Sequence, residues 1–263
     1  MERIILVTGG NREVITKGVT KSVAKVDSSA GSPFWLDLLS PSERVLNRLA
    51  VGFRFEAKAL KSCLSWQRST GCDDFGNHIF IAACLLEPSK RHLFIQSDVK
   101  IFLNNSYLIT IHKRRRPIAR LAASLQASAF HRTGTLLLAI LDPFIGRLTK
   151  SVCGERNIQD FRAVLGKLNK SSLWWQLRNL EKALIRQSNL LEEIAFVGAR
   201  FFDRRDMDTF RSLRAKHCFL SATARALLSS VDISENNACH ASRDNPRGKR
   251  RSSRGFRRGG SES

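Results

Sequence analysis

The sequence lacks any apolar run long enough to cross a lipid bilayer. A membrane-spanning helix needs about 20 consecutive apolar residues, whereas the longest such run, Leu136–Leu141, has the length of a buried helix segment. The N-terminal segment MERIILVTGG also lacks the apolar stretch and small-residue cleavage site of a secretory signal. We therefore expect a chain that neither spans a membrane nor is secreted.

The spacings that carry metal or catalytic chemistry are also missing. The six cysteines form no Cys-x-x-Cys pair and no Cys/His cluster of the kind that binds zinc, so free thiols in a reducing compartment are expected. There is no nucleophile elbow, no complete P-loop and no metal-binding His/Glu pair at helical spacing. Gly9-Gly10 follows a strand-like segment, but further strand-like residues come next, which disfavours a dinucleotide site. The sequence therefore predicts that the protein is not an enzyme.

Acidic residues are scarce, since 23 Asp and Glu stand against 44 Lys and Arg, for a formal net charge of +21. Such an excess favours nucleic acid, an anionic membrane surface or acidic partners. The last part of the chain is rich in Arg and Gly, and segments of this kind contact phosphates and stack on bases. One interpretation is thus a nucleic-acid-binding protein, with contact residues Arg250, Arg251, Arg254, Arg257 and Arg258.

The sharpest local pattern lies between Asp98 and Arg120 and predicts a β-hairpin followed by a helix. Apolar residues alternate up to Leu103, Asn104-Asn105-Ser106 tolerates turn conformations, and a β-favouring run then reaches Ile111. Pro117 stands where a helix can begin without losing a needed N–H group.

The rest of the chain predicts an α+β fold with a mixed sheet first and long helices second. Strands are expected at Phe34–Leu39, Ile79–Leu86 and His92–Gln96, and helices from Ser40–Glu43 onward, at Glu56–Leu64 and at Thr133–Asp142, with Pro143 kinking or ending the last one. Helical periodicity resumes from Ile158. We expect an α/β domain over residues 1–142, a helical stalk-like region over 143–230 and a disordered tail over 231–263.

Two kinds of side chain within these segments have a structural and a functional interpretation. His78 is isolated in the sequence, so a structural histidine is favoured over a ligand. Trp174 and Trp175 suit either core packing or a neighbouring subunit, and core packing is the expectation.

Several of these segments resemble phrases of the CorA family of magnesium and cobalt (divalent-cation) transport proteins. They stand in the family's order between residues 34 and 228. The matching segments are Trp35–Glu43, Gln67-Arg68 with Asp73–Phe80, Phe102–His112, Gly134–Asp142 and Phe201–Asp206.

The resemblance implies a pentameric cytoplasmic funnel below a pore in the cell (inner) membrane, with hydrated Mg²⁺ as cargo and Co²⁺ or Ni²⁺ as secondary ions. Asp203 and Asp206 occupy the two aspartate positions of the family's stalk helix, which makes them candidate metal ligands. Family members often carry an acidic residue where Ser62 stands here, beside Lys61, and that change weakens the expected metal site.

The family's two membrane helices and its Gly-Met-Asn motif do not follow Leu228 in this sequence. The resemblance therefore predicts a truncated cytoplasmic domain, either a damaged gene product or a soluble regulator on the cytoplasmic face. Cation passage would then require joining full-length CorA-like subunits.

Overall fold

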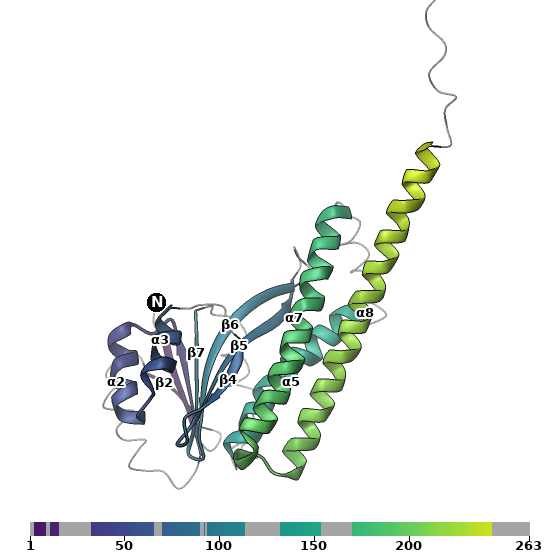
Figure 1. The fold of residues 1–263 in the computed structure, drawn as a ribbon. Coiled ribbons are helices and arrows are strands. Elements are labelled where there is room, and N and C mark those ends of the chain that lie inside the picture. Colours follow the sequence, from purple (N-terminus) through teal and green to yellow (C-terminus); the bar gives the residue numbers. More distant parts are fainter. Residues whose placement is uncertain are drawn as a thin grey trace, which may run out of the picture.

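The computed structural model describes residues 3–8, 11–15, 33–65, 70–89, 92, 94–113, 132–153 and 170–243. Within them a mixed sheet has the strand order β2-β1-β3-β7-β6-β5-β4 (Figure 1). The strands are β1 (Arg3–Thr8), β2 (Asn11–Ile15), β3 (Phe34–Leu39), β4 (Gly71–Asp74), β5 (Ile79–Pro88), β6 (Phe94–Leu103) and β7 (Tyr107–His112). The helices are α2 (Glu43–Phe53), α3 (Ala57–Ser65), α5 (Thr133–Cys153), α7 (Lys170–Val197) and α8 (Arg204–Arg243), with a short 3₁₀ helix, η2 (Ala199–Phe201).

The predicted hairpin is confirmed as β6 and β7, which pair antiparallel up to Leu103 opposite Leu108. Its turn is fixed by Asn104, whose side-chain oxygen accepts a hydrogen bond from the Ser106 N–H at 2.6 Å. This local bond is the reason that asparagine favours turns. The α+β class is also confirmed.

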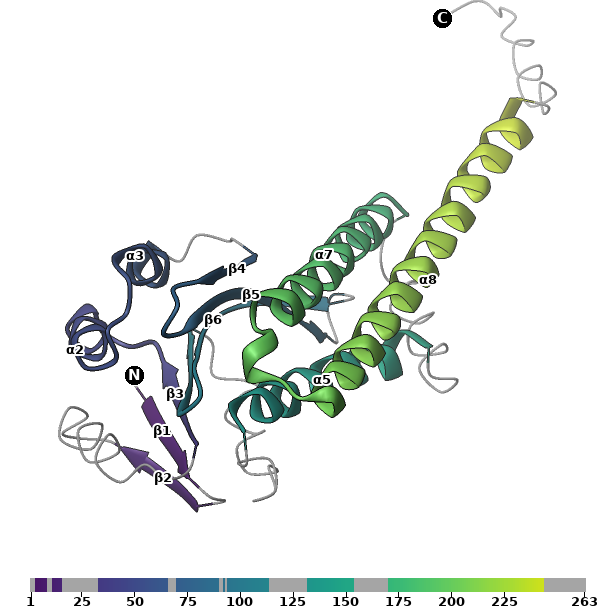
Figure 2. The same ribbon diagram turned by 60° about the horizontal axis from the view of Figure 1, so that its bottom comes forward.

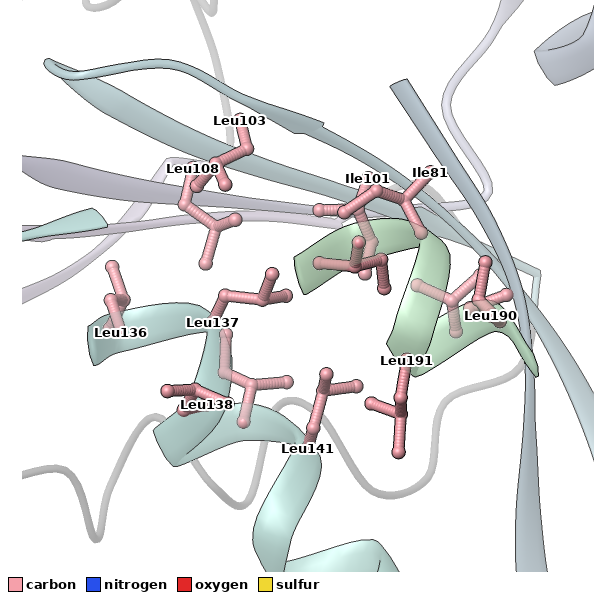
Figure 3. Packing of buried hydrophobic residues seen from close by; sticks show 14 of the residues in the cluster. Ile81, Ile101, Leu103, Leu108, Leu136, Leu137, Leu138, Leu141, Leu190 and Leu191 are labelled. Atoms are coloured by element: carbon pink, nitrogen blue, oxygen red, sulfur yellow. The ribbon is translucent and has the colours of Figure 1, made fainter. Parts of the chain in front are cut away.

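Helices cover both faces of the sheet (Figure 2). Successive side chains of a strand point to opposite faces, and in the central strands β3 and β7 both sets are buried. The face under α2 and α3 buries Leu36, Phe102 and Ile109. On the opposite face, Ile81 and Ile101 pack against leucines of α5 and α7 in the larger of the two cores (Figure 3). At about 25 cal/mol per Å² of buried apolar surface, these two layers supply the main stabilising free energy.

Three expectations about the helical part need correction. Pro143 does not end α5, which continues to Cys153, because apolar residues on both sides of the proline, among them Leu141 and Phe144, are buried in the core. α8 continues to Arg243, so residues 231–243 are helical rather than disordered, and neither Gly nor Pro interrupts them. Trp175 is 65% exposed rather than a core residue.

Other expectations fall on residues that the structure does not describe. These are the helix after Pro117 and the periodic segment from Ile158 to Leu168. None of the helices in the described ranges combines the length and the apolar character needed to cross a membrane.

A buried polar network crosses the parallel pair β3 and β7, where Asp37 lies opposite Thr110. Asp37 Oδ1 accepts a hydrogen bond from the Thr110 hydroxyl at 2.6 Å and lies 2.9 Å from His112 Nε2. Thr110 Oγ1 in turn accepts a bond from the indole N–H of Trp35 at 2.9 Å. Since all four side chains are buried, each hydrogen bond replaces one that water would otherwise make.

We expect Asp37→Ala to lower the free energy of unfolding by about 3 kcal/mol, because it leaves buried donors without their acceptor. Urea unfolding followed by circular dichroism measures the change. Asp73→Ala is the matched control, since its 2.8 Å ion pair with Lys58 is exposed and pairs of that kind contribute about 1 kcal/mol or less. Equal losses in the two variants would contradict the importance of the network.

Candidate cation site at the start of helix α8

The two candidate metal ligands form a reciprocal cap at the first turn of α8. Asp203 Oδ1 accepts a hydrogen bond from the Asp206 N–H at 2.8 Å, and Asp206 Oδ2 accepts one from the Asp203 N–H at 3.2 Å. This arrangement is a capping box, which satisfies backbone donors that a helix start leaves unpaired. The carboxylates also lie at the positive end of the helix dipole.

The beginning of α5 supplies the other contacts of these carboxylates. The Thr135 hydroxyl donates a hydrogen bond to Asp206 Oδ1 at 3.0 Å, and Arg132 Nη1 lies 3.5 Å from Asp203 Oδ2. Asp206 is buried, at 4% exposure, whereas the Asp203 side chain is 42% exposed. Only Asp203 of the two acids is therefore open to solvent.

The ring of Phe202 fixes the position of this site. It lies so close to Gly134 of α5 and to Gly198 after α7 that an added Cβ atom would come within 2.4 Å and 2.7 Å of it, respectively. The ring also meets Phe210 of α8 edge to face, with centroids 4.7 Å apart. Phe202 thus ties three helices together one residue before the cap.

The described residues of one chain form only an incomplete cation site. Mg²⁺ prefers octahedral oxygen ligands and keeps several waters, but each carboxylate oxygen of Asp203 and Asp206 already faces a donor. Among the residues that the structure describes, no three His, Cys, Asp or Glu side chains gather as a metal-binding group. Further ligands would have to come from outside the described residues, for example from water or a second chain, and Asp203 is the accessible member of the pair.

The remaining candidate residues lie elsewhere or outside the described part. Lys61 and Ser62 are on α3, which covers the face of the sheet opposite α8 (Figure 2), so one chain does not bring them to Asp203. Arg250, Arg251, Arg254, Arg257 and Arg258 all fall within 244–263, which the structure does not describe.

An arginine clamp holds the turn between β4 and β5 against the end of α7. Arg200 makes two 2.6 Å contacts with the carboxylate of Asp74 and donates a third bond to the Gly76 carbonyl at 3.0 Å. This bidentate geometry is the strong form of an ion pair. Hydrogen bonding to Arg200 lowers the pKa of Asp74 to about 2.

His78, beside this turn, is a structural residue, but not a hydrogen-bonded one. It is fully buried among the rings of Phe55, Phe75 and Phe102, and neither ring nitrogen has a hydrogen-bond partner among the residues that the structure describes. Burial lowers the pKa of His78 below its ordinary value of 6.5, because the charged imidazolium loses water there.

The sequence contains a signal for the cap at Asp203 but none for the network around Asp37. The order Asp203-Arg204-Arg205-Asp206 carries the three-residue spacing of a capping box, which would have predicted the cap. The network around Asp37 had no such signal, because its partner Thr110 lies 73 residues away along the chain.

Comparisons with known proteins give a consistent result. Residues 31–198 match the model of a family described as CorA-like Mg²⁺ transporter protein, while no curated protein matches the chain in sequence. The interpretation as a nucleic-acid-binding protein gains no support.

Solved structures share the fold at low sequence identity. The soluble domain of CorA from Methanocaldococcus jannaschii has a TM-score of 0.63 and 16% identity, over 88% of this chain and 95% of that one. The complete CorA magnesium transporter of the same organism has a TM-score of 0.60 and 17% identity, over 90% and 78%. The cytoplasmic domain of ZntB from Vibrio parahaemolyticus has a TM-score of 0.65 and 10% identity, over 92% and 99%.

We expect Asp203→Ala to lower the free energy of unfolding by about 1 kcal/mol through loss of the cap, and Asp203→Ser to stay close to the wild type, because serine is an equally good N-cap residue. Urea unfolding of both variants measures the difference. A serine variant as unstable as the alanine variant would show that the carboxylate charge, and not the cap, provides the stability.

We expect His78 to make the protein less stable as the pH falls. The folded state binds the His78 proton more weakly than the unfolded state, so the stability present above pH 6.5 declines below it. His217, whose pKa is also lowered by burial, acts in the same direction. Urea unfolding about one pH unit above and below 6.5 should show a smaller decline for His78→Phe than for the wild type. An unchanged decline in that variant would contradict the assignment to His78.

Proposed function

Because this chain belongs to the family of CorA-like Mg²⁺ transporter proteins, we propose that it supplies a cytoplasmic domain to an assembly that passes Mg²⁺ across the cell (inner) membrane. Co²⁺ or Ni²⁺ would be secondary ions. Passage of the cation would occur through full-length CorA-like subunits that this chain joins, and the chain itself would lie on the cytoplasmic face.

The observation that carries the proposal is the long helix α8 in a chain with this family's fold. Its 40 residues correspond to a length of about 60 Å, and it projects past the sheet and the other helices in both views (Figures 1 and 2). Such a helix can connect a sheet domain to a distant pore. Ion pairs from Arg214 to Glu192 and from Arg225 to Glu181 hold it against α7.

Exposed apolar side chains on the helical layer support assembly with further subunits. Phe219 of α8 is 58% exposed and Phe196 of α7 is 85% exposed. Burying side chains of this size would contribute about 1.5–3 kcal/mol each. We propose a pentamer, by analogy with the family.

Asp203 is the second part of the proposal. Mg²⁺ would bind its accessible carboxylate together with water and oxygens of a neighbouring subunit, while Asp206 keeps the carboxylate in place through the cap. Lys61 would oppose this binding if the neighbouring subunit brought it close, because its ammonium repels the cation.

We expect the weight-average mass of the wild-type chain, measured by sedimentation, to rise with millimolar Mg²⁺ at constant ionic strength toward the mass of five subunits. Asp203→Ser keeps the cap and removes the carboxylate, so it should require severalfold more Mg²⁺ for the same mass. Phe219→Glu should remain monomeric at every Mg²⁺ concentration. Val51→Glu, at an 82% exposed apolar position on α2, is the control and should behave as the wild type.

If the wild-type chain stays monomeric at every Mg²⁺ concentration, the proposed self-assembly is overturned. Co-expression with a full-length family member and purification through a tag on that subunit tests the mixed assembly separately. If the chain co-purifies with the full-length subunit but leaves Mg²⁺ uptake unchanged, the role of the chain is restricted to binding that subunit.

A further inference from the structure

A groove of about 710 Å³ lies between the start of β6 and the first half of α7, away from the candidate cation site. His92 and Gln96 line one wall. The other wall is a single stripe of α7, because its residues recur three or four positions apart. In Figure 1 the end of β5 and the start of β6 lie beside the first half of α7. The volume is within the range of small-molecule sites.

The groove is basic at one end, and the described residues that line it include no acidic side chain. Lys182 and Arg186 stand four residues apart on α7, so two like charges lie one turn apart and repel each other. Among the ion pairs of the described residues, none includes Lys182 or Arg186. An anion bound between them would relieve the repulsion and supply the missing partner.

The other end of the groove presents an aromatic face. Trp175 is 65% exposed and lines the groove. The adjacent Trp174 instead packs against a small apolar cluster, and the guanidinium of Arg178 lies 5.7 Å from the centre of its ring. Trp175 precedes Lys182 by seven residues, which is two helical turns or about 10 Å. Between the aromatic face and the cations, the amide of Asn179 lines the groove.

We propose that this groove binds a nucleoside triphosphate, with the base stacked on Trp175 and the phosphates held by Lys182 and Arg186. An indole stacks on any base, and ammonium and guanidinium groups are the usual partners of phosphate oxygens. The side-chain amide of Asn179 carries both donors and an acceptor for the base or ribose. A simple inorganic anion would use the cationic end and leave the indole exposed.

The charge of the groove also selects the form of the nucleotide. Mg²⁺ bound to the phosphates cancels part of their negative charge, and none of the described lining residues offers a carboxylate to hold the metal. The uncomplexed nucleotide should therefore bind more tightly than its Mg²⁺ complex. This inference is independent of the proposed transport function, because no residue of the groove belongs to the capping box.

Isothermal titration of the full chain with ATP, with chelator present, tests the site. Lys182→Gln combined with Arg186→Gln should weaken ATP binding by at least about tenfold, since two charge-assisted contacts are lost. Arg44→Gln combined with Arg48→Gln removes the same charge at the same helical spacing on α2, and should leave binding unchanged. An equal loss in this control would show nonspecific attraction to a basic chain and overturn the site.

Variants of Trp175 and a second ligand test the aromatic end of the groove in the same titration. Trp175→Ala should weaken ATP binding by about tenfold, and Trp175→Phe should restore most of it, because stacking needs only an aromatic face. Inorganic triphosphate should bind the wild type more weakly than ATP and should not respond to Trp175→Ala. Equal affinity for ATP and triphosphate would overturn the nucleotide assignment, as would tighter binding of ATP when Mg²⁺ is in excess.

Discussion

The close packing of Phe202 against two glycines is the constraint on which the helical layer depends. Gly134 and Gly198 lack side chains at the points where α5 and the end of α7 meet this ring. The ring holds α5, α7 and α8 in contact, and the capping box of Asp203 and Asp206 follows directly. Each element that bears on the proposed cation site therefore takes its position from a steric fit, to which the polar contacts of Thr135 and Arg132 are added.

The sequence was most informative where the determining contacts are local. Alternation and the Asn104 turn predicted the β6–β7 hairpin, and proline with serine predicted the start of α2. The structure places Ser42 at the N-cap of that helix without a side-chain cap bond, while the Ser40 hydroxyl donates a hydrogen bond to the Lys113 carbonyl. The predicted boundary is therefore right, but the local cap bond expected of serine is not made, and the Ser40 hydroxyl binds a residue 73 positions away.

Where distant contacts decide, the sequence misled. Pro143 disfavours a helix locally, but burial of its neighbours on α5 outweighs the lost hydrogen bond. Trp175 resembled a core residue because aromatic side chains usually are, and only the position of β6 shows that it faces a groove. The strand order, and with it the Asp37 network, depends on pairing between segments that have no local signal for each other.

The excess of basic over acidic residues affects cation sites and anion sites in opposite ways. Acidic side chains are largely used in fixed positions: Asp74 with Arg200, Glu181 with Arg225 and Glu192 with Arg214. Further ion pairs join Lys58 to Asp73, Lys216 to Asp142 and Arg211 to Asp208. By contrast, none of the ion pairs in the described part of the chain includes Lys182 or Arg186. The same imbalance makes a divalent-cation site hard to complete within one chain and makes an anion site easy to form.

The parallel pairing of β3 with β7 also governs how the chain folds during synthesis. β3 lies between β1 and β7 in the sheet, and its Asp37 awaits a partner 73 residues later. At a synthesis rate of about 5–20 residues per second, roughly 4–15 s pass before that partner exists. Throughout this interval one side of β3 offers unpaired N–H and C=O groups beside a row of apolar side chains. The nascent N-terminal half is thus exposed to aggregation, which makes it a segment for chaperones to shield.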